Sequence, residues 1–232
     1  MGARKINSDP MNAPRIVRRL TVKEQIVAAS ACATLGALIG GALDSRTTSF
    51  DRAFRRVTRS RAAGRARTVL GPLFYLGLPG AYIPIAYATG LWVRHRGRRG
   101  GPSIVAAAWI GWLAHRGVKA VYVRARPRAH PPRSDSYPSG HTMGATALSL
   151  TIGRVLTREG LLSYRAGLAL ALGASAAMGA SRVLSDDHWI TDVIGGWMFG
   201  AAVGGLVSGV SDGSSTAPVP KSTQPLHHSA SA

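Results

Sequence analysis

Six mostly apolar segments, each close to the length of a membrane-spanning helix, follow one another along this chain of 232 residues. A helix needs about 20 apolar residues to cross the hydrocarbon core of a bilayer. The segments cover approximately residues 25–43, 69–93, 102–118, 140–156, 166–184 and 190–211. Six of them leave little chain for a soluble core. The sequence therefore predicts an all-α fold, a polytopic membrane helix bundle with six transmembrane spans.

Two details qualify this pattern. The third and fourth segments are marginal in length, so buried helices of a soluble protein are an alternative for them. Several segments are rich in Ala and Gly, as at Gly195 and Gly196. Small residues let helix backbones approach closely in lipid, where the hydrophobic effect no longer drives helices together. We expect such glycines to serve close helix packing.

The positive charge lies outside the apolar segments. The formal net charge is +19, and it falls almost wholly in the N-terminal arm and the connecting loops. A soluble nucleic-acid-binding protein would not alternate basic clusters with uncharged stretches of membrane length. We expect no nucleic-acid partner. Anionic headgroups and an anionic phosphate substrate account better for the charge.

The chain ends differ in composition from its middle. Residues 1–24 form a basic arm and 212–232 a tail rich in Ser, Pro, Gly and Thr, and we expect both to be disordered. The single cysteine, Cys32, lies in the first apolar segment, so no intramolecular disulfide is possible. That segment is longer than a typical signal-peptide core and no clear cleavage site follows it. We interpret it as a permanent helix of a membrane domain covering 25–211.

Three short strings in the second half of the chain each lie at the end of an apolar segment. They are Lys119-x6-Arg126-Pro127, Pro138-Ser139-Gly140-His141 and Ser181-Arg182-x5-His188-x3-Asp192. Together they supply three cations, two imidazoles and a carboxylate. This set suits phosphoryl transfer through a histidine nucleophile, with no metal and no cofactor. The site would lie at the membrane surface, at the ends of spans 3 to 6.

Residue chemistry suggests a role for each group. His188 and Asp192 are four residues apart and share a helix face, so the carboxylate can hold one imidazole nitrogen and leave the other free to attack phosphorus. The alternative for Asp192 is a helix cap. His141 opens the fourth segment, where a bound anion would meet unpaired backbone N–H groups, and it can protonate the departing oxygen. The cations Lys119, Arg126 and Arg182 would neutralise the phosphoryl oxygens.

Other polar residues near the strings have two interpretations each. His115 lies one helical turn before Lys119 and either lines the pocket or is a buried, satisfied histidine. Asp186 and Asp187 either tune the pKa of His188 or cap the following helix. Three arginines are either charges at the mouth of the site or solvated loop residues: Arg124, Arg128 and Arg133.

The three strings resemble the tripartite signature of the type 2 phosphatidic acid phosphatase superfamily, which also includes vanadium haloperoxidases. The pattern K-x6-R-P, P-S-G-H and S-R-x5-H-x3-D is met at every specified position. The resemblance implies that His188 forms a phosphohistidine, with Asp192 as its partner and His141 as the acid. It also implies a set of phosphate-binding residues: Lys119, Arg126, Ser139, Gly140 and Arg182.

The implied activity is hydrolysis of a lipid phosphate monoester or diphosphate. Substrates similar to those of the family are phosphatidic acid, phosphatidylglycerol phosphate and polyprenyl diphosphates, including undecaprenyl diphosphate. A phosphotransferase using the same intermediate is one alternative. A small membrane transporter is another, although the chain shows none of the internal repeats common in transporters. Oligomeric state is not encoded in these patterns.

An even number of spans places both chain ends on one side of the membrane and all three strings on the other. Lys and Arg number 14 on the side of the chain ends and 15 on the other, so the positive-inside rule does not decide the orientation. Phe50, Ala53, Phe54 and Val57 form an apolar stripe opposite arginines, typical of a helix lying in the headgroup plane. We expect a protein of the cell (inner) membrane with its site on the exoplasmic face.

Overall fold

The computed structural model describes residues 20–44, 46–128 and 135–214. Within these ranges the chain is helical and contains no strand. The helices are α1 (Val22–Leu43), α2 (Ser49–Thr58), the 3-10 helix η2 (Arg61–Ala63), α3 (Gly64–Leu70), the 3-10 helix η3 (Gly71–Gly77), α4 (Pro79–His95), α5 (Gly101–Lys119), α6 (Gly140–Arg158), α7 (Tyr164–Leu184) and α8 (Ile190–Ser214). The all-α prediction is confirmed. The predicted arm and tail fall largely outside the described residues.

Five of the six apolar segments coincide with single helices, namely α1 and α5 to α8. The second segment, predicted as one helix over 69–93, is instead broken. The helical stretch Arg61–Gly77 meets α4 at an angle of 72°. Pro72 and Pro79 occupy early positions of η3 and α4, where proline starts a helical segment because it cannot donate to the preceding turn. The prediction of an unbroken second helix was wrong.

Three helices in the described part of the chain are long and apolar enough to cross a membrane, and four if the bent pair counts as one span. They are α1, α7 and the stretch Ile190–Val210 of α8. The helix α4 alone has only 17 residues. The helices α5 and α6 carry polar side chains, and on α6 these are largely buried inside the bundle, which is why α6 need not be apolar to lie among membrane helices. The protein is an integral membrane protein, and the count of six spans stays a prediction.

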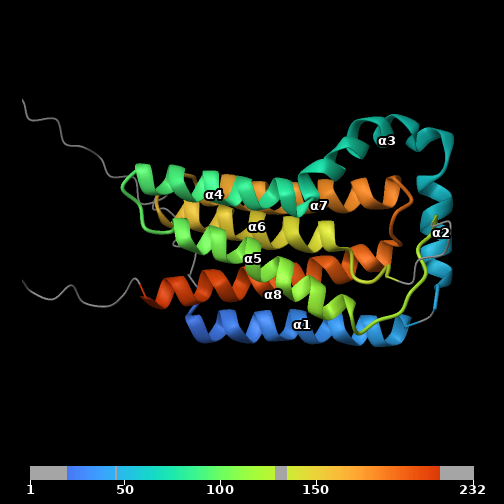
Figure 1. Ribbon diagram of the computed structural model, residues 1–232, viewed down its shortest axis with the longest axis horizontal. Helices are drawn as coiled ribbons and strands as arrows, with labels where there is room; N and C mark the ends of the chain where they lie inside the picture. The colour runs from blue at the N-terminus through green and yellow to red at the C-terminus, as the bar shows by residue number, and fades with distance from the viewer. Residues whose placement is uncertain (1–19, 45, 129–134, 215–232) are drawn as a thin grey trace, which may run out of the picture.

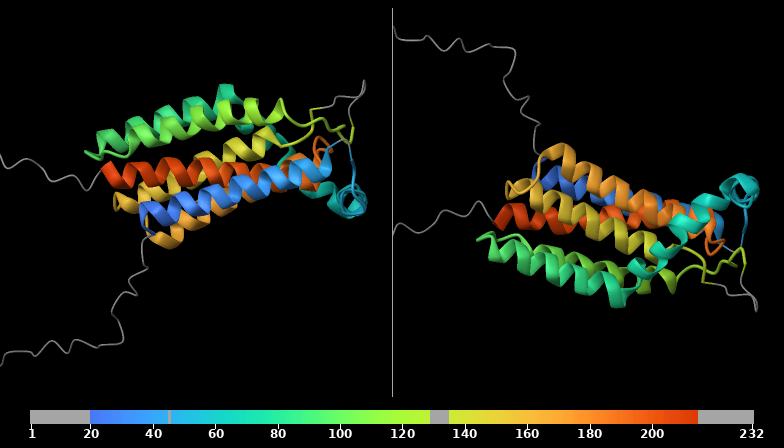
Figure 2. Two further views of the ribbon diagram at one scale, coloured as in Figure 1. Left: turned by 90° about the horizontal axis from the view of Figure 1, so that it is seen from below. Right: turned by 90° about the horizontal axis from the view of Figure 1, so that it is seen from above.

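The long helices run side by side, with α6 in contact with α4, α5, α7 and α8 (Figures 1 and 2). Glycine allows the closest approaches. A Cβ on Gly200 of α8 would lie 2.6 Å from the carbonyl oxygen of Met143 on α6. A Cβ on Gly153 of α6 would lie 2.4 Å from the carbonyl oxygen of Gly167 on α7. These contacts confirm that small residues serve close helix packing, as expected from the composition.

The two ends of the bundle differ. The helix α1 begins and α8 ends at one end, and α2 lies across the opposite end, roughly at right angles to the long helices (Figures 1 and 2). The predicted stripe is present on α2, where Phe50 and Val57 are exposed. The opposite face of α2 points to the bundle through Asp51, which is buried. That end of the bundle also holds the three sequence strings.

Candidate active site

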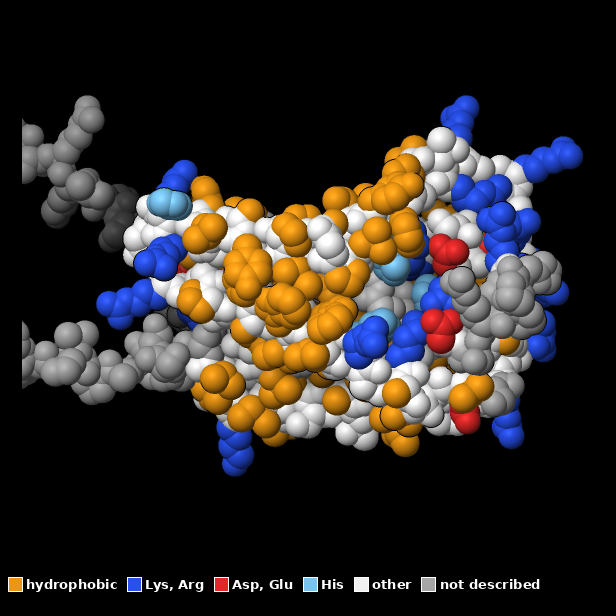
Figure 3. Space-filling model, viewed as in Figure 1, with side chains coloured by type: hydrophobic (Ala, Val, Ile, Leu, Met, Phe, Trp, Pro, Cys, Tyr) orange, Lys and Arg blue, Asp and Glu red, His pale blue; other side chains and the backbone are white. Residues whose placement is uncertain are grey.

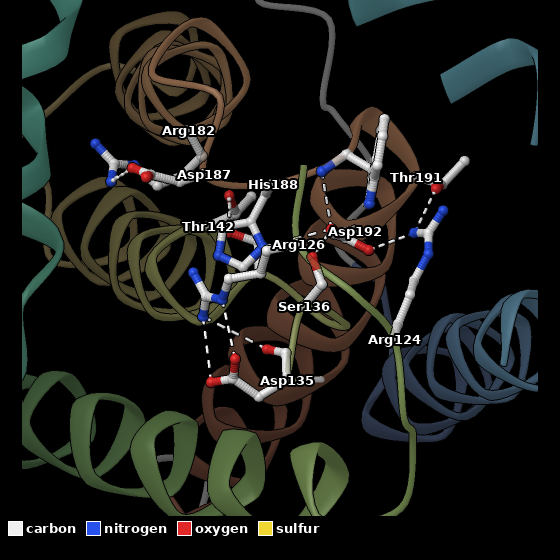
Figure 4. Close-up of polar contacts among 12 residues, drawn as sticks. Arg124, Arg126, Asp135, Ser136, Thr142, Arg182, Asp187, His188, Thr191 and Asp192 are labelled. Carbon is white, nitrogen blue, oxygen red and sulfur yellow. Dashed lines mark hydrogen bonds and ion pairs between the residues drawn. The ribbon is translucent and has the colours of Figure 1, made fainter. Parts of the chain in front are cut away.

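The structure brings the predicted site residues together where four helices meet. Lys119 is the last residue of α5, His141 is the second residue of α6, Arg182 lies in the last turn of α7, and Asp192 lies in the first turn of α8. Figure 3 shows histidine side chains in a hollow between an apolar band and a group of Lys and Arg side chains at this end. Figure 4 shows how the polar groups face one another.

His188 and Asp192 form the centre of the site. Nδ1 of His188 lies 3.4 Å from Oδ2 of Asp192, and both side chains are buried. The same carboxylate oxygen accepts hydrogen bonds from the Ser136 hydroxyl at 2.5 Å and from the Trp189 backbone N–H at 2.8 Å. The contact with Trp189 caps the start of α8, so Asp192 both caps the helix and faces His188. Sequence spacing presented these two roles as alternatives, and the structure contains both.

Arg124 joins Asp192 to α2. Its guanidinium donates to Oδ1 of Asp192 and, at 2.5 Å, to Oδ2 of Asp51, and its side chain is only 1% exposed. Asp51 also accepts a hydrogen bond from the Thr191 hydroxyl at 2.7 Å. Both sequence interpretations of Arg124, as a charge at the mouth of the site and as a solvated loop residue, were wrong. Its neighbours lie 68 and 73 residues away in the sequence, so no local pattern could reveal this pairing.

Two of the predicted phosphate-binding cations share a carboxylate. Arg126 donates to both carboxylate oxygens of Asp135, at 3.0 and 3.3 Å, and Nζ of Lys119 lies 3.8 Å from Oδ2. Burial favours the neutral form of Asp135, but the hydrogen bond and charge of Arg126, with the charge of Lys119, hold its pKa below the usual value. Asp135 therefore carries a negative charge against the cations predicted to bind phosphate.

Arg182, in the last turn of α7, makes three contacts at the site. It donates to Oδ2 of Asp187 at 2.9 Å and to the Ser181 hydroxyl at 2.8 Å, and its guanidinium carbon lies 4.8 Å from the ring centre of Phe74. Asp187 therefore pairs with a predicted phosphate ligand. Asp186 binds Arg55 of α2 through two hydrogen bonds of 2.7 Å. The structure gives both aspartates arginine partners, a role that differs from the two considered for them in the sequence.

His141 is placed by the bent segment η3. Its ring stacks on Phe74 with centroids 4.9 Å apart, and a Cβ on Gly77 would lie 2.5 Å from its Cδ2 atom. Phe74 therefore contacts both His141 and Arg182. Phe74 belongs to none of the three strings and was missed in the sequence analysis. The predicted straight helix over 69–93 gave no reason to place Phe74 near the strings. The break before α4 is what brings it to the site.

The Pro-Ser-Gly-His string contributes mainly backbone geometry. Ser139 is fully buried, its backbone N–H donates to the carbonyl of Asp192 at 3.0 Å, and its hydroxyl accepts from Thr142 at 3.0 Å. Gly140 opens α6, and a Cβ there would lie 2.4 Å from Nε2 of His115 on α5. His115 thus belongs to the walls of the site. Both residues lie beside the histidines predicted to be catalytic, and their contact with phosphate stays a prediction.

Three buried side-chain nitrogen atoms at this site have no hydrogen-bond partner among the described residues, namely Nε2 of His115, Nε2 of His141 and Nε of Arg182. Nδ1 of His188 also makes no hydrogen bond, but it faces the Asp192 carboxylate at 3.4 Å. Buried polar groups in folded proteins nearly always have a partner, from the protein or from a ligand or water. The positive charges of Lys119, Arg126 and Arg182 act on the three groups, so an anion with several oxygen atoms fits as the missing partner. Among residues 20–44, 46–128 and 135–214, no group of three His, Cys, Asp or Glu side chains is arranged to hold a metal.

The charge state of His188 suits a nucleophile. Burial lowers the pKa of this imidazole below its ordinary value, although the nearby Asp192 carboxylate opposes the shift. The ring is therefore neutral at pH 7, with a lone pair on one nitrogen. Asp192 faces Nδ1, so the nitrogen left for attack is Nε2.

The fold and the site together define an all-helical integral membrane protein with a histidine-centred, cation-rich pocket at one end of the bundle. Residues 102–214 match the PAP2 superfamily. This confirms the resemblance seen in the three strings. No match is found among curated proteins.

A solved structure has the same fold. It is the first transmembrane PAP2 type phosphatidylglycerolphosphate phosphatase from Bacillus subtilis, with a TM-score of 0.64 and 22% sequence identity. The similarity covers 80% of this chain and 96% of that chain. At this identity the likeness shows the fold alone, that of a PAP2-type membrane lipid phosphatase.

Proposed function

We propose that this protein hydrolyses a lipid phosphate monoester or diphosphate through a phosphohistidine on His188. The observation that carries the proposal is the neutral, buried His188 beside Asp192, in a pocket whose unpartnered nitrogens and cations suit a phosphoryl group. Nε2 of His188 attacks phosphorus, and the bond from phosphorus to the lipid oxygen breaks. His141, protonated when the anionic phosphate is bound beside it, donates its proton to that oxygen. Water then attacks the phosphohistidine and gives a proton to His141, so that phosphate is released, His188 returns to a neutral imidazole and His141 to its protonated form.

Cationic side chains take the part that a metal plays in many phosphatases. Negative charge redistributes over the phosphoryl oxygens in the transition state, and fixed donors in a dry site stabilise it strongly. Arg182 is 1% exposed, and Lys119 and Arg126 keep side-chain exposures of 17% and 22%. We therefore expect catalysis without a metal ion or other cofactor.

The position of the hollow favours a lipid substrate. It borders an apolar band on the face shown in Figure 3, where acyl or polyprenyl chains could lie while the phosphate reaches the histidines. The structural neighbour is named as a phosphatidylglycerolphosphate phosphatase. Phosphatidylglycerol phosphate, phosphatidic acid and polyprenyl diphosphates are accordingly the substrates to test first.

Purified protein in detergent micelles, supplied with each lipid in turn, tests the activity. We expect phosphate release that survives EDTA and is blocked by vanadate, a phosphoryl-transfer mimic. His188→Ala should abolish the phospho-enzyme and turnover. His141→Ala should regain part of its activity on p-nitrophenyl phosphate, whose leaving group needs less protonation, while the exposed His95→Ala at the other end of the bundle serves as control. A strict need for Mg²⁺, or equal losses on both substrates for both active-site variants, would refute the mechanism. Transfer to an added lipid alcohol in place of water would indicate a phosphotransferase.

We also propose that the site faces the exoplasmic side of the cell membrane. Single cysteines at Ala62, near the catalytic end, and at Arg98, in the α4–α5 loop at the opposite end, can test this in a Cys32→Ser background. Both positions are exposed. In intact cells an impermeant maleimide should label position 62 and spare position 98. The reverse result would place the site in the cytoplasm.

A further inference from the structure

A third histidine belongs to the catalytic pocket, although none of the three strings contains it. His115 lies on α5 one turn before Lys119, so the two side chains share a helix face that ends at the site. The imidazole lies against Gly140, where a Cβ would be 2.4 Å from Nε2 and 2.5 Å from Cε1. Glycine at this position therefore leaves room for the ring next to His141.

The residues around His115 do not provide a hydrogen-bond partner for its Nε2 atom. Nε2 is buried and has no hydrogen-bond partner among the described residues. The groups whose charges act on the ring are Lys119, His188, Arg116 and Arg126, which are cationic or imidazole groups. The cations Lys119, Arg116 and Arg126 have no lone pair with which to accept a hydrogen bond from Nε2, and neutral His188 makes no hydrogen bond to it. Nε2 of His115 therefore has no acceptor among these groups, and it lies where the surrounding positive charges favour an anion.

We infer that His115 is a further substrate-binding residue, whose Nε2–H donates a hydrogen bond to a phosphoryl oxygen of the substrate. This inference rests on the proposed phosphatase function. A phosphate group placed at His188 has three non-bridging oxygens, and the three signature cations approach it from α5, the α5–α6 loop and α7. His115 adds a neutral donor from the side of α5 that faces Gly140. The same contact would hold inorganic phosphate, the product.

Two substitutions separate this role from simple packing against Gly140. His115→Gln keeps an N–H donor near the position of Nε2 but loses the ring, and His115→Phe keeps a ring but has no donor. If His115 binds phosphate, the Phe variant should raise the inhibition constant for inorganic phosphate and the KM for substrate about tenfold or more, while the Gln variant stays within about threefold of the wild type. If the ring only fills space, the ranking should reverse, because Phe packs there and Gln does not.

The measurement is competitive inhibition by inorganic phosphate during p-nitrophenyl phosphate hydrolysis, with kcat and KM determined separately. Only variants whose melting temperature in detergent equals that of the wild type are compared. His115→Ala replaces the Phe variant if the Phe variant does not fold. Equal inhibition constants for the wild type and the variant lacking the donor would overturn the inference. Failure of the proposed function would look different, since wild-type protein and the His95→Ala control would then release no phosphate.

Discussion

Removal of the Arg124 side chain tests whether the buried charge network holds the catalytic end together. Arg124 is 1% exposed, and the two carboxylates that it contacts, Asp51 and Asp192, are 0% exposed. Arg124→Met would leave both carboxylates buried without their cation. Breaking a buried ion pair in this way costs about 3–5 kcal/mol, because the remaining charge keeps its desolvation penalty and loses its compensation.

The expected change is large enough to measure in detergent. For a chain of this size, 1 kcal/mol corresponds to a shift of about 2–4 °C in Tm, so Arg124→Met should lower the melting temperature by about 6–20 °C. Arg56, on the same end of the molecule, is exposed and provides the matched control. Arg56→Met should change stability by no more than about 0.5 kcal/mol. Thermal unfolding followed by circular dichroism or by a thiol-reactive dye at Cys32 would report both.

A double variant distinguishes lost charge compensation from lost packing. In Arg124→Met with Asp51→Asn, one of the two uncompensated carboxylates becomes a neutral amide, which can still accept from Thr191. We expect this pair of changes to melt above the single Arg124→Met variant. A single variant that melts within about 2 °C of the wild type, or a double variant that is less stable than the single one, would refute the reasoning.

Two further predictions concern the charges around the pocket. Asp135→Asn should lower the inhibition constant for inorganic phosphate about two- to fivefold, because a partly exposed carboxylate no longer competes for Lys119 and Arg126. Glu159→Gln, at the other end of the bundle, is the control. Weaker phosphate binding in the Asp135 variant would contradict this prediction. The acid limb of kcat/KM, corrected for substrate ionisation, should lie below the ordinary imidazole pKa of about 6.5, because the lowered pKa of His188 keeps the nucleophile neutral as the pH falls. An acid limb at or above that value would show that His188 is not buried in the active protein.

Much of the fold was readable from hydropathy alone. Five helices fall within a few residues of the apolar segments, because long runs without charge have few alternatives in a bilayer. The break before α4 was not predicted, since Leu and Tyr occur on both sides of Gly77 and mean hydropathy does not reveal a bend. The low hydropathy of α6 also follows from position, because a helix surrounded by other helices can carry serine and threonine.

Only those site residues that belong to the three short sequence strings could be predicted. The spacing of His188 and Asp192 places them on one helix face, and the structure has them 3.4 Å apart. The residues that hold this pair come from elsewhere in the chain. Ser136 precedes the second string, and Asp51 lies on a helix that shows only an amphipathic pattern, so the sequence gives no sign that either touches the third string. Such pairings depend on the tertiary fold.

The helix α2 therefore has two faces with separate tasks. Its exposed apolar residues suit the membrane surface, as the sequence indicated. Its inner face binds the catalytic end twice, through Asp51 to Arg124 and through Arg55 to Asp186. Both anchors lie before residue 102, outside the part of the chain that matches the PAP2 superfamily. The proposed catalytic residues lie in the matched region, but two buried charges of that region, Arg124 and Asp186, have partners on α2. Because an unpaired buried charge is costly, the geometry of the His188–Asp192 pair depends on a helix that carries none of the signature residues.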